Sequence, residues 1–130
     1  MILDSSAVLA ILFTEPDAKV FAKAISEADS CKISAASFVE VAAVVESQTH
    51  AKGGRQFDAF MRRARVEIEP VTEEQAHLAR QAYADFGKGR HPAGLNFGDC
   101  FSYALAKATG EPLLFKGGDF SKTDVRAALA

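Results

Sequence analysis

Three long apolar stretches of this chain each contain a single charged residue, and in each case that residue is a carboxylate. The stretches are residues 1–13, 33–45 and 92–106, and their acids are Asp4, Glu40 and Asp99. A fourth acid, Asp119, follows the apolar run at 113–115. Segments this apolar are buried, and a buried carboxylate needs a partner that compensates its charge. Because no Lys or Arg shares the three stretches, the pattern indicates acids that converge on a hard divalent cation.

The composition fits one compact domain spanning residues 1–130. Of the 130 residues, 48% are apolar, which is enough for a hydrophobic core and too many for a disordered chain. The net charge of −2 excludes a generally basic surface, so any contact with nucleic acid must use local patches. Cys31 and Cys100 form no metal motif and indicate buried thiols in a reducing cytoplasm. The apolar N-terminus has no basic flank, so we expect neither a signal peptide nor a membrane span.

Short apolar strands alternate with helices along the chain. Strands are predicted at residues 1–3, 31–34, 66–71 and 112–115, and helices at 5–13, 15–28, 37–49, 55–65, 72–86 and 96–109. Residues 125–129 fit either a last strand or a short helix. Ser37 is expected to cap its helix, with Glu40 completing a capping box, and Val66 and Ile68 are expected to face inward. The alternation predicts an α/β fold with a short, mostly parallel central sheet flanked by helices.

The predicted fold can bring the four acids to one edge of the sheet. Asp4 and Asp119 follow strands, whereas Glu40 and Asp99 are expected in the first turns of helices, and sites in parallel sheets form at the carboxyl ends of strands. Each acid also has a simpler explanation, as a helix cap, a residue favoured by a helix dipole, or a turn aspartate. Four such acids in apolar settings favour a shared site over four separate coincidences.

Three segments of the chain resemble a known family. They are ILDSSA at 2–7, SFVEV at 37–41 and LNFGDCFSYALAKATGEPLLFKGGDFSKTDV at 95–125. In this order and spacing they are similar to PIN-domain proteins and, more narrowly, to the VapC-type toxins of bacterial toxin–antitoxin pairs. The resemblance covers essentially the whole chain. It implies a PIN-like domain, endoribonuclease activity that depends on Mg²⁺ or Mn²⁺, a homodimer, and neutralisation by a cognate VapB-type antitoxin.

The resemblance also implies roles for individual residues. The catalytic quartet of the family matches Asp4, Glu40, Asp99 and Asp119, of which Asp4, Asp99 and Asp119 are the implied metal ligands. Secondary polar positions match Ser6, Thr123 and Asp124. This chain has Gly-Gly-Asp at 117–119 where Gly-Asn-Asp is common in the family, a change that leaves the acid in place.

Two surfaces are expected to bind partners. RNA is expected to contact local cations near the acids, namely Lys88, Arg90 and Lys116. By family resemblance, the antitoxin is expected to occupy a groove formed by the first helices, with Phe13 and Phe21 among its lining residues. The sequence does not identify which RNA is cut.

Two other functions fit parts of the pattern. One is a phosphatase-like hydrolase that uses Asp4 as a covalent nucleophile, although Ser6 stands where such enzymes have a second aspartate. The other is a metal-binding interaction module without catalysis. A trapped phosphoaspartate would identify the first, and a metal titration would separate the second from a nuclease.

Overall fold

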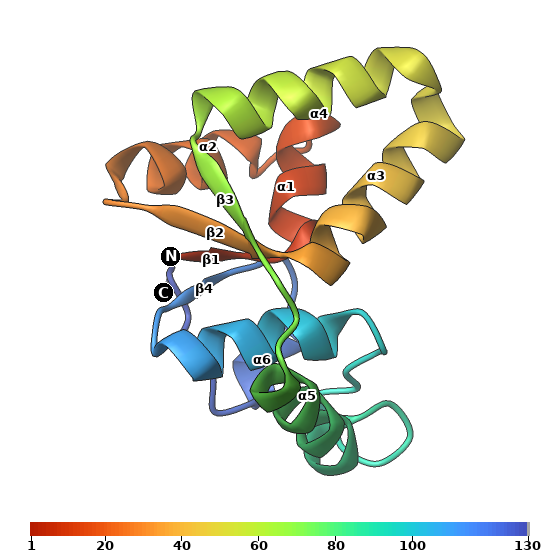
Figure 1. The fold of residues 1–130 in the computed structure, drawn as a ribbon, viewed down its shortest axis with the longest axis vertical. Helices are drawn as coiled ribbons and strands as arrows, with labels where there is room; N and C mark the ends of the chain where they lie inside the picture. The colour runs from red at the N-terminus through yellow and green to blue at the C-terminus, as the bar shows by residue number, and fades with distance from the viewer. Residues whose placement is uncertain (130) are drawn as a thin grey trace.

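A parallel sheet separates two groups of helices in the computed structural model, which describes residues 1–129 (Figure 1). The strands β1 (Ile2–Leu3), β2 (Cys31–Ser34), β3 (Val66–Glu69) and β4 (Leu113–Leu114) form a four-stranded sheet in the order β3-β2-β1-β4. On one side lie α1 (Ser5–Leu12), α2 (Ala18–Glu27), α3 (Ala35–Thr49) and α4 (Ala51–Arg63). On the other side lie α5 (Glu73–Phe86) and α6 (Asp99–Thr109), and a 3₁₀ helix, η1 (Phe120–Lys122), follows β4. The predicted α/β fold with a short parallel sheet is confirmed, and no helix of residues 1–129 combines the length and apolarity needed to cross a membrane.

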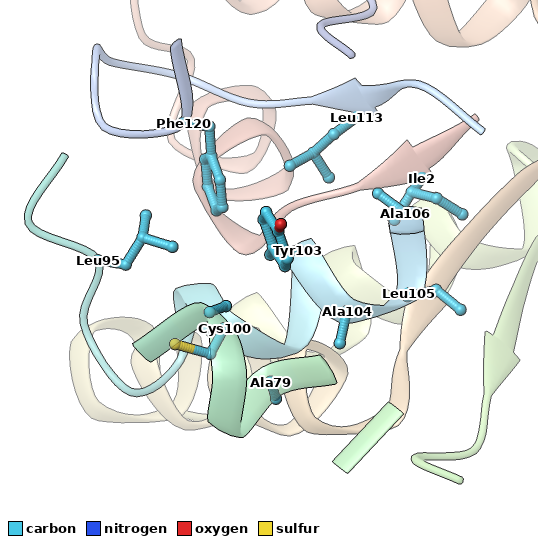
Figure 2. Close-up of a cluster of buried hydrophobic side chains, with 11 residues drawn as sticks. Ile2, Ala79, Leu95, Cys100, Tyr103, Ala104, Leu105, Ala106, Leu113 and Phe120 are labelled. Atoms are coloured by element: carbon cyan, nitrogen blue, oxygen red, sulfur yellow. The ribbon is translucent and has the colours of Figure 1, made fainter. Parts of the chain in front are cut away.

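The two-residue strands β1 and β4 contribute side chains to both layers of the core. Ile2 pairs with Leu113, and both pack among the buried residues of α5 and α6 (Figure 2). Leu3 pairs with Leu114, and both pack on the opposite side among α1 to α4. Successive strand residues point to opposite faces of a sheet. All four side chains are therefore buried, which explains why these strands are continuously apolar.

Helix starts gather at the carboxyl edge of the sheet. Asp4 follows β1 directly and caps α1, because its carboxylate accepts a hydrogen bond from the backbone N–H of Ser6. Ser34 ends β2 and caps α3 in the same way, accepting from Ala36. The first residues of α1, α3 and α6 lie on the same side of the molecule, to the right of centre in Figure 1. Two of the acids lie at such helix starts, because Asp4 caps α1 and Asp99 is the first residue of α6.

Two local predictions are wrong. The cap of α3 is Ser34 rather than Ser37, which lies inside the first turn and is 1% exposed. The capping box with Glu40 therefore does not form, and Glu40 lies in the second turn instead of the first. Ile68 was expected to face the core but is 48% exposed, because β3 is the edge strand of the sheet.

The segment after η1 returns to the sheet in an extended form. The backbone N–H of Leu113 donates to the carbonyl of Arg126 at 2.8 Å, and the N–H of Ala128 donates to the carbonyl of Leu113 at 2.8 Å. Ala127 thus forms a single parallel bridge beside β4. Of the two alternatives for residues 125–129, the strand-like one is correct.

Candidate functional site

Four elements carry the four acids to the carboxyl edge of the sheet. Asp4 ends β1 and is only 2% exposed. Asp99 is the first residue of α6, and Glu40 lies on α3; both are half-buried. Asp119 follows β4, precedes η1 and is exposed. We name these four residues the carboxylate rim.

The electrostatics of Asp99 show that the rim acids are close neighbours. Burial, together with the negative charges of Asp4, Asp119 and Glu40, raises the pKa of Asp99 from 3.8 to about 6. A hydrogen bond from the backbone N–H of Asn96 to Asp99 Oδ2, at 3.1 Å, opposes the rise. Like charges shift a pKa in this direction only at short range. The convergence expected from the sequence is therefore present in this structure.

Gly98 forms the contact between Glu40 and the start of α6. A Cβ atom built on Gly98 would lie 2.2 Å from Oε2 of Glu40, so the carboxylate rests against the bare backbone. The backbone of Gly98 has φ −63° and ψ −38°, a conformation that any residue adopts. Glycine is thus required here by the close approach of Glu40 and not by backbone strain.

Hydroxyl groups surround the buried carboxylate of Asp4. Oδ2 accepts from the N–H of Ser6 at 3.0 Å and from its Oγ at 2.6 Å. Oδ1 accepts from Oγ of Ser102 at 2.6 Å, and Ser102 in turn lies 3.0 Å from Oγ of Ser37. Ser6 also accepts from the backbone N–H of Lys116, at 2.9 Å, which connects Asp4 to the loop that carries Asp119. Ser6, expected near the site, is in direct contact with it.

The donor set of the rim fits a magnesium or manganese ion. All its donors are carboxylate oxygens, and within residues 1–129 none of the four acids forms an ion pair. In the same part of the chain, no group of three or more acidic, histidine or cysteine side chains is placed closely enough to bind one metal ion as it stands. The rim is therefore an open arrangement. Mg²⁺ suits such an arrangement because it keeps several of its own waters and needs few protein ligands.

Thr123 and Asp124 form hydrogen bonds with residues outside the carboxylate rim. The carboxylate of Asp124 accepts from Tyr103 Oη at 2.6 Å and from Lys107 Nζ at 3.1 Å, and the bond from Tyr103 lowers the pKa of Asp124. Thr123 Oγ1 donates to the carbonyl of Phe120 at 2.7 Å. Asp124 thereby fastens the C-terminal segment to α6, whereas Thr123 closes the turn that follows η1. Among the described residues, none of these hydrogen bonds reaches one of the four acids, and the secondary roles of Thr123 and Asp124 stay a prediction.

The three predicted RNA-binding cations differ in whether they already form ion pairs within the protein. Lys116 Nζ is paired with Glu15 and, at 3.5 Å, with Asp17, so its charge is already compensated. Lys88 and Arg90 are exposed in the loop between α5 and α6 and form no ion pair within the described residues. Backbone hydrogen bonds close this loop, since the N–H of Lys88 donates to the carbonyl of Leu95 and the N–H of Leu95 donates to that of Phe86, both at 2.9 Å.

Sequence reasoning missed Ser102 and misassigned Ser37. Ser37 stands three residues before Glu40, and Ser102 stands three residues after Asp99. A spacing of three places two side chains on the same face of a helix, whether or not a cap forms. An isolated hydroxyl on the same face as an isolated acid is the signal that could have identified both residues.

A groove of 620 Å³ lies between α2 and α4, at the amino ends of β2 and β3. Its lining includes the apolar side chains of Ile25 and Phe60 and the cations Arg63 and Arg65. Phe21, predicted to line a partner groove, is 5% exposed and belongs to the core. This groove is therefore not the predicted one, because neither Phe13 nor Phe21 lines it and α1 takes no part in it.

A second, strongly apolar hollow of 360 Å³ lies between α5 and the start of α6. Tyr83, Phe97 and Phe101 line it, and the rings of Phe97 and Phe101 meet edge to face at 5.0 Å. Phe97 is 77% exposed, the largest value among the exposed large apolar residues of the described chain. An aromatic side chain this exposed commonly marks an interaction surface.

Comparisons with known proteins agree on one family. The PIN domain family model matches residues 1–126. Ribonuclease VapC28 of Mycobacterium tuberculosis is 54% identical over 130 residues, covering 99% of this chain and 98% of that protein. The crystal structure of Mycobacterium tuberculosis VapC20, described as a sarcin-ricin loop cleaving toxin, superimposes with a TM-score of 0.77 at 17% identity, covering 95% of both chains. VapBC2 of Rickettsia felis, solved with a DNA fragment from its promoter, gives 0.77 at 13% identity, covering 97% of this chain and 94% of that one. The chain therefore belongs to the PIN domain family and, within it, to the VapC ribonucleases.

Proposed function

We propose that this VapC ribonuclease is a Mg²⁺- or Mn²⁺-dependent endoribonuclease that hydrolyses RNA phosphodiester bonds at the carboxylate rim. The observation that carries the proposal is the crowding of three carboxylates around that of Asp99, with no ion pair to any of the four within residues 1–129. We further propose that it is the toxin of a toxin–antitoxin pair and acts in the cytoplasm. The buried free thiols of Cys31 and Cys100 suit that reducing compartment.

The four residues of the rim have different proposed roles. Asp4, Asp99 and Asp119 hold the ion, and Glu40 either adds a ligand or orients the attacking water. A bound divalent ion supplies Lewis-acid polarisation of the phosphate and a water of lowered pKa. Asp4 keeps a fixed orientation because Ser6 and Ser102 hold both of its oxygens.

Lys88 and Arg90 are the better candidates for contacts with the RNA backbone. Both are exposed on the loop that leads into α6 and towards Asp99. Lys116 would have to leave Glu15 and Asp17 before it could bind a phosphate. We therefore assign Lys116 a secondary place in RNA binding.

The phosphatase-like alternative fits the surroundings of Asp4 poorly. A carboxylate whose oxygens already accept three hydrogen bonds is a weak nucleophile. The interaction-module alternative predicts metal binding without cleavage, which the following experiment measures.

Cleavage of total bacterial RNA by the purified protein is expected to require Mg²⁺ or Mn²⁺. EDTA should abolish cleavage, restored Mg²⁺ or Mn²⁺ should recover it, and Ca²⁺ should support it poorly because it is larger and less strictly coordinated. Mapping of the cut sites by RNA sequencing would also identify the substrate. Cleavage that survives exhaustive chelation would contradict the metal-dependent mechanism, and Mn²⁺ binding without any cleavage would favour the interaction module.

The antitoxin is proposed to bind the groove between α2 and α4. The solved structure named VapBC2 supports the expectation that a VapC protein has a partner. The groove is lined by apolar side chains and by side chains of both charges. A helix or extended segment with an apolar face suits such a groove. The small protein encoded beside this chain's gene is the candidate.

A bulky residue in this groove should weaken the complex without affecting catalysis. Ala22 is exposed and lines the groove, so Ala22→Arg blocks it without disturbing the core. We expect at least about tenfold weaker binding in calorimetry and unchanged RNA cleavage by the free protein. Ala84→Arg, at an exposed site on α5, is the matched control. Equal affinity of both variants would place the antitoxin elsewhere.

A second copy of this chain is proposed to cover the aromatic hollow. The exposed ring of Phe97, with Tyr83 and Phe101, offers the apolar centre that a homodimer interface needs. Light scattering on the same samples used for the antitoxin complex reports the number of copies.

A further inference from the structure

The two oxygens of Asp4 are held by different parts of the fold. Oδ2 takes both of its hydrogen bonds from Ser6, within the first turn of α1. Oδ1 takes its bond from Ser102, which lies on α6 and is 0% exposed. Ser102 is therefore not a local cap, because it lies 98 positions from Asp4 in the sequence.

The direction of the hydroxyl chain follows from the donors available. An ionised carboxylate has no hydrogen to give, so Ser102 donates to Asp4 Oδ1. A serine hydroxyl has one hydrogen, and that of Ser102 is then used. In the contact of 3.0 Å between the two hydroxyls, Ser37 must therefore donate to Ser102. The chain runs from Ser37 through Ser102 to Asp4.

This chain connects the elements that carry three of the four rim acids. Ser37 lies on α3 with Glu40, Ser102 lies on α6 with Asp99, and Asp4 ends β1. In each helix the serine and the acid are three residues apart and share a face. The two hydroxyls thus fix α3, α6 and β1 relative to one another at the depth of the rim.

The same bonds leave Asp4 one free acceptor position. A carboxylate offers about four lone-pair positions on its two oxygens. Two donors occupy Oδ2 and one occupies Oδ1. Among the described residues, no further donor reaches either oxygen, so the remaining position is on Oδ1.

We propose that Ser102, oriented by Ser37, is a positioning residue that fixes Asp4 as a ligand with a single free site on Oδ1. The inference rests on the proposed metal-dependent function and assigns this chain's own residues a role in it. Groups that hold a metal ligand in place typically contribute tenfold to a hundredfold to metal affinity or activity. Ser102 does this from a fully buried place between α6 and Asp4.

The test compares Ser102→Ala with the unmodified protein in two measurements. Mn²⁺ affinity is measured by electron paramagnetic resonance without RNA, and kcat and KM are measured for cleavage in Mg²⁺. We expect at least about tenfold weaker Mn²⁺ binding and about tenfold lower kcat, with KM for RNA unchanged. Ser37→Ala should produce the same changes to a smaller extent, because Ser102 still reaches Asp4.

Two further variants make the outcome decisive. Ser47→Ala removes an exposed hydroxyl on α3 that bonds only to the carbonyl of Val44, and it should leave both measurements unchanged. If Ser102→Ala does not fold, Ser102→Cys keeps the volume with a weaker donor, and a decrease of the same kind supports the proposal. Wild-type Mn²⁺ affinity and kcat in the folded Ser102 variant would overturn it. Failure of the unmodified protein to bind Mn²⁺ would instead overturn the proposed function.

Discussion

Asp99→Asn is expected to abolish RNA cleavage and, at the same time, to stabilise the metal-free protein. The loss of cleavage should reach about a thousandfold, since one ligand of a charge-stabilising ion contributes several kcal/mol to the transition state. The gain in stability arises because the introduced amide would be neutral among three carboxylates, while its oxygen still accepts the bond from Asn96.

The gain should depend on pH in a defined direction. The pKa of Asp99 is about 6 in the folded protein, above its ordinary value of 3.8, so the folded state binds the proton more tightly than the unfolded state. The free energy of unfolding therefore falls as pH rises from about 4 through 6. Asp99→Asn removes this decrease in the free energy of unfolding with rising pH. One pKa unit corresponds to about 1.4 kcal/mol, and screening of this half-exposed group reduces the expected gain to about 1–2 kcal/mol above pH 6.

Urea unfolding in EDTA at pH 4 and pH 7.5 measures this difference. The variant should match the unmodified protein at pH 4 and exceed it at pH 7.5. Asp58→Asn, which removes an exposed carboxylate on α4, is the control and should change neither cleavage nor stability. Full cleavage by Asp99→Asn would remove the rim from the mechanism. A gain in stability that is equal at both pH values would show that charge crowding is not its cause.

Gly98→Ala is expected to reduce cleavage by about a hundredfold while leaving the fold intact. The new methyl group would occupy the place of Glu40 Oε2, and that oxygen is the end of a flexible side chain that can move aside. Displacement of a catalytic group by about 1 Å costs about this much in rate. The free energy of unfolding should change by less than about 1 kcal/mol, because the backbone of Gly98 is already helical.

A double-variant cycle tests whether Gly98 acts through Glu40. Combined with Glu40→Gln, Gly98→Ala should add little further loss, since both changes affect the same carboxylate. Gly54→Ala is the matched control, because a Cβ there meets open space on α4. It should leave cleavage unchanged. Losses that multiply in the double variant would indicate a separate role for Gly98.

The sequence was sufficient to predict the fold and the group of acids because both depend on local patterns. Apolar runs at β1, β2 and β4 define buried parallel strands, and a lone Asp or Glu in such a run has few explanations. The PIN resemblance then assigned the acids to one site. These predictions depended on residue type and order alone.

Contacts between distant segments could not be predicted from the sequence. The pairing of Lys116 with Glu15 joins residues 101 positions apart, and Ser102 meets Asp4 across 98 positions. Ser37 was misassigned because the capping-box spacing and the shared-face spacing are the same, and only the end of β2 at Ser34 decides between them. Local patterns restrict such contacts without selecting them.

The absence of a side chain at Gly98 has a genetic consequence. Every glycine codon begins with two guanines, and any single-base change at either position encodes a residue with a Cβ atom or a stop. Each such missense change places an atom against Glu40. We therefore expect point mutations at Gly98 to weaken the ribonuclease while leaving the remaining surface available to its partners.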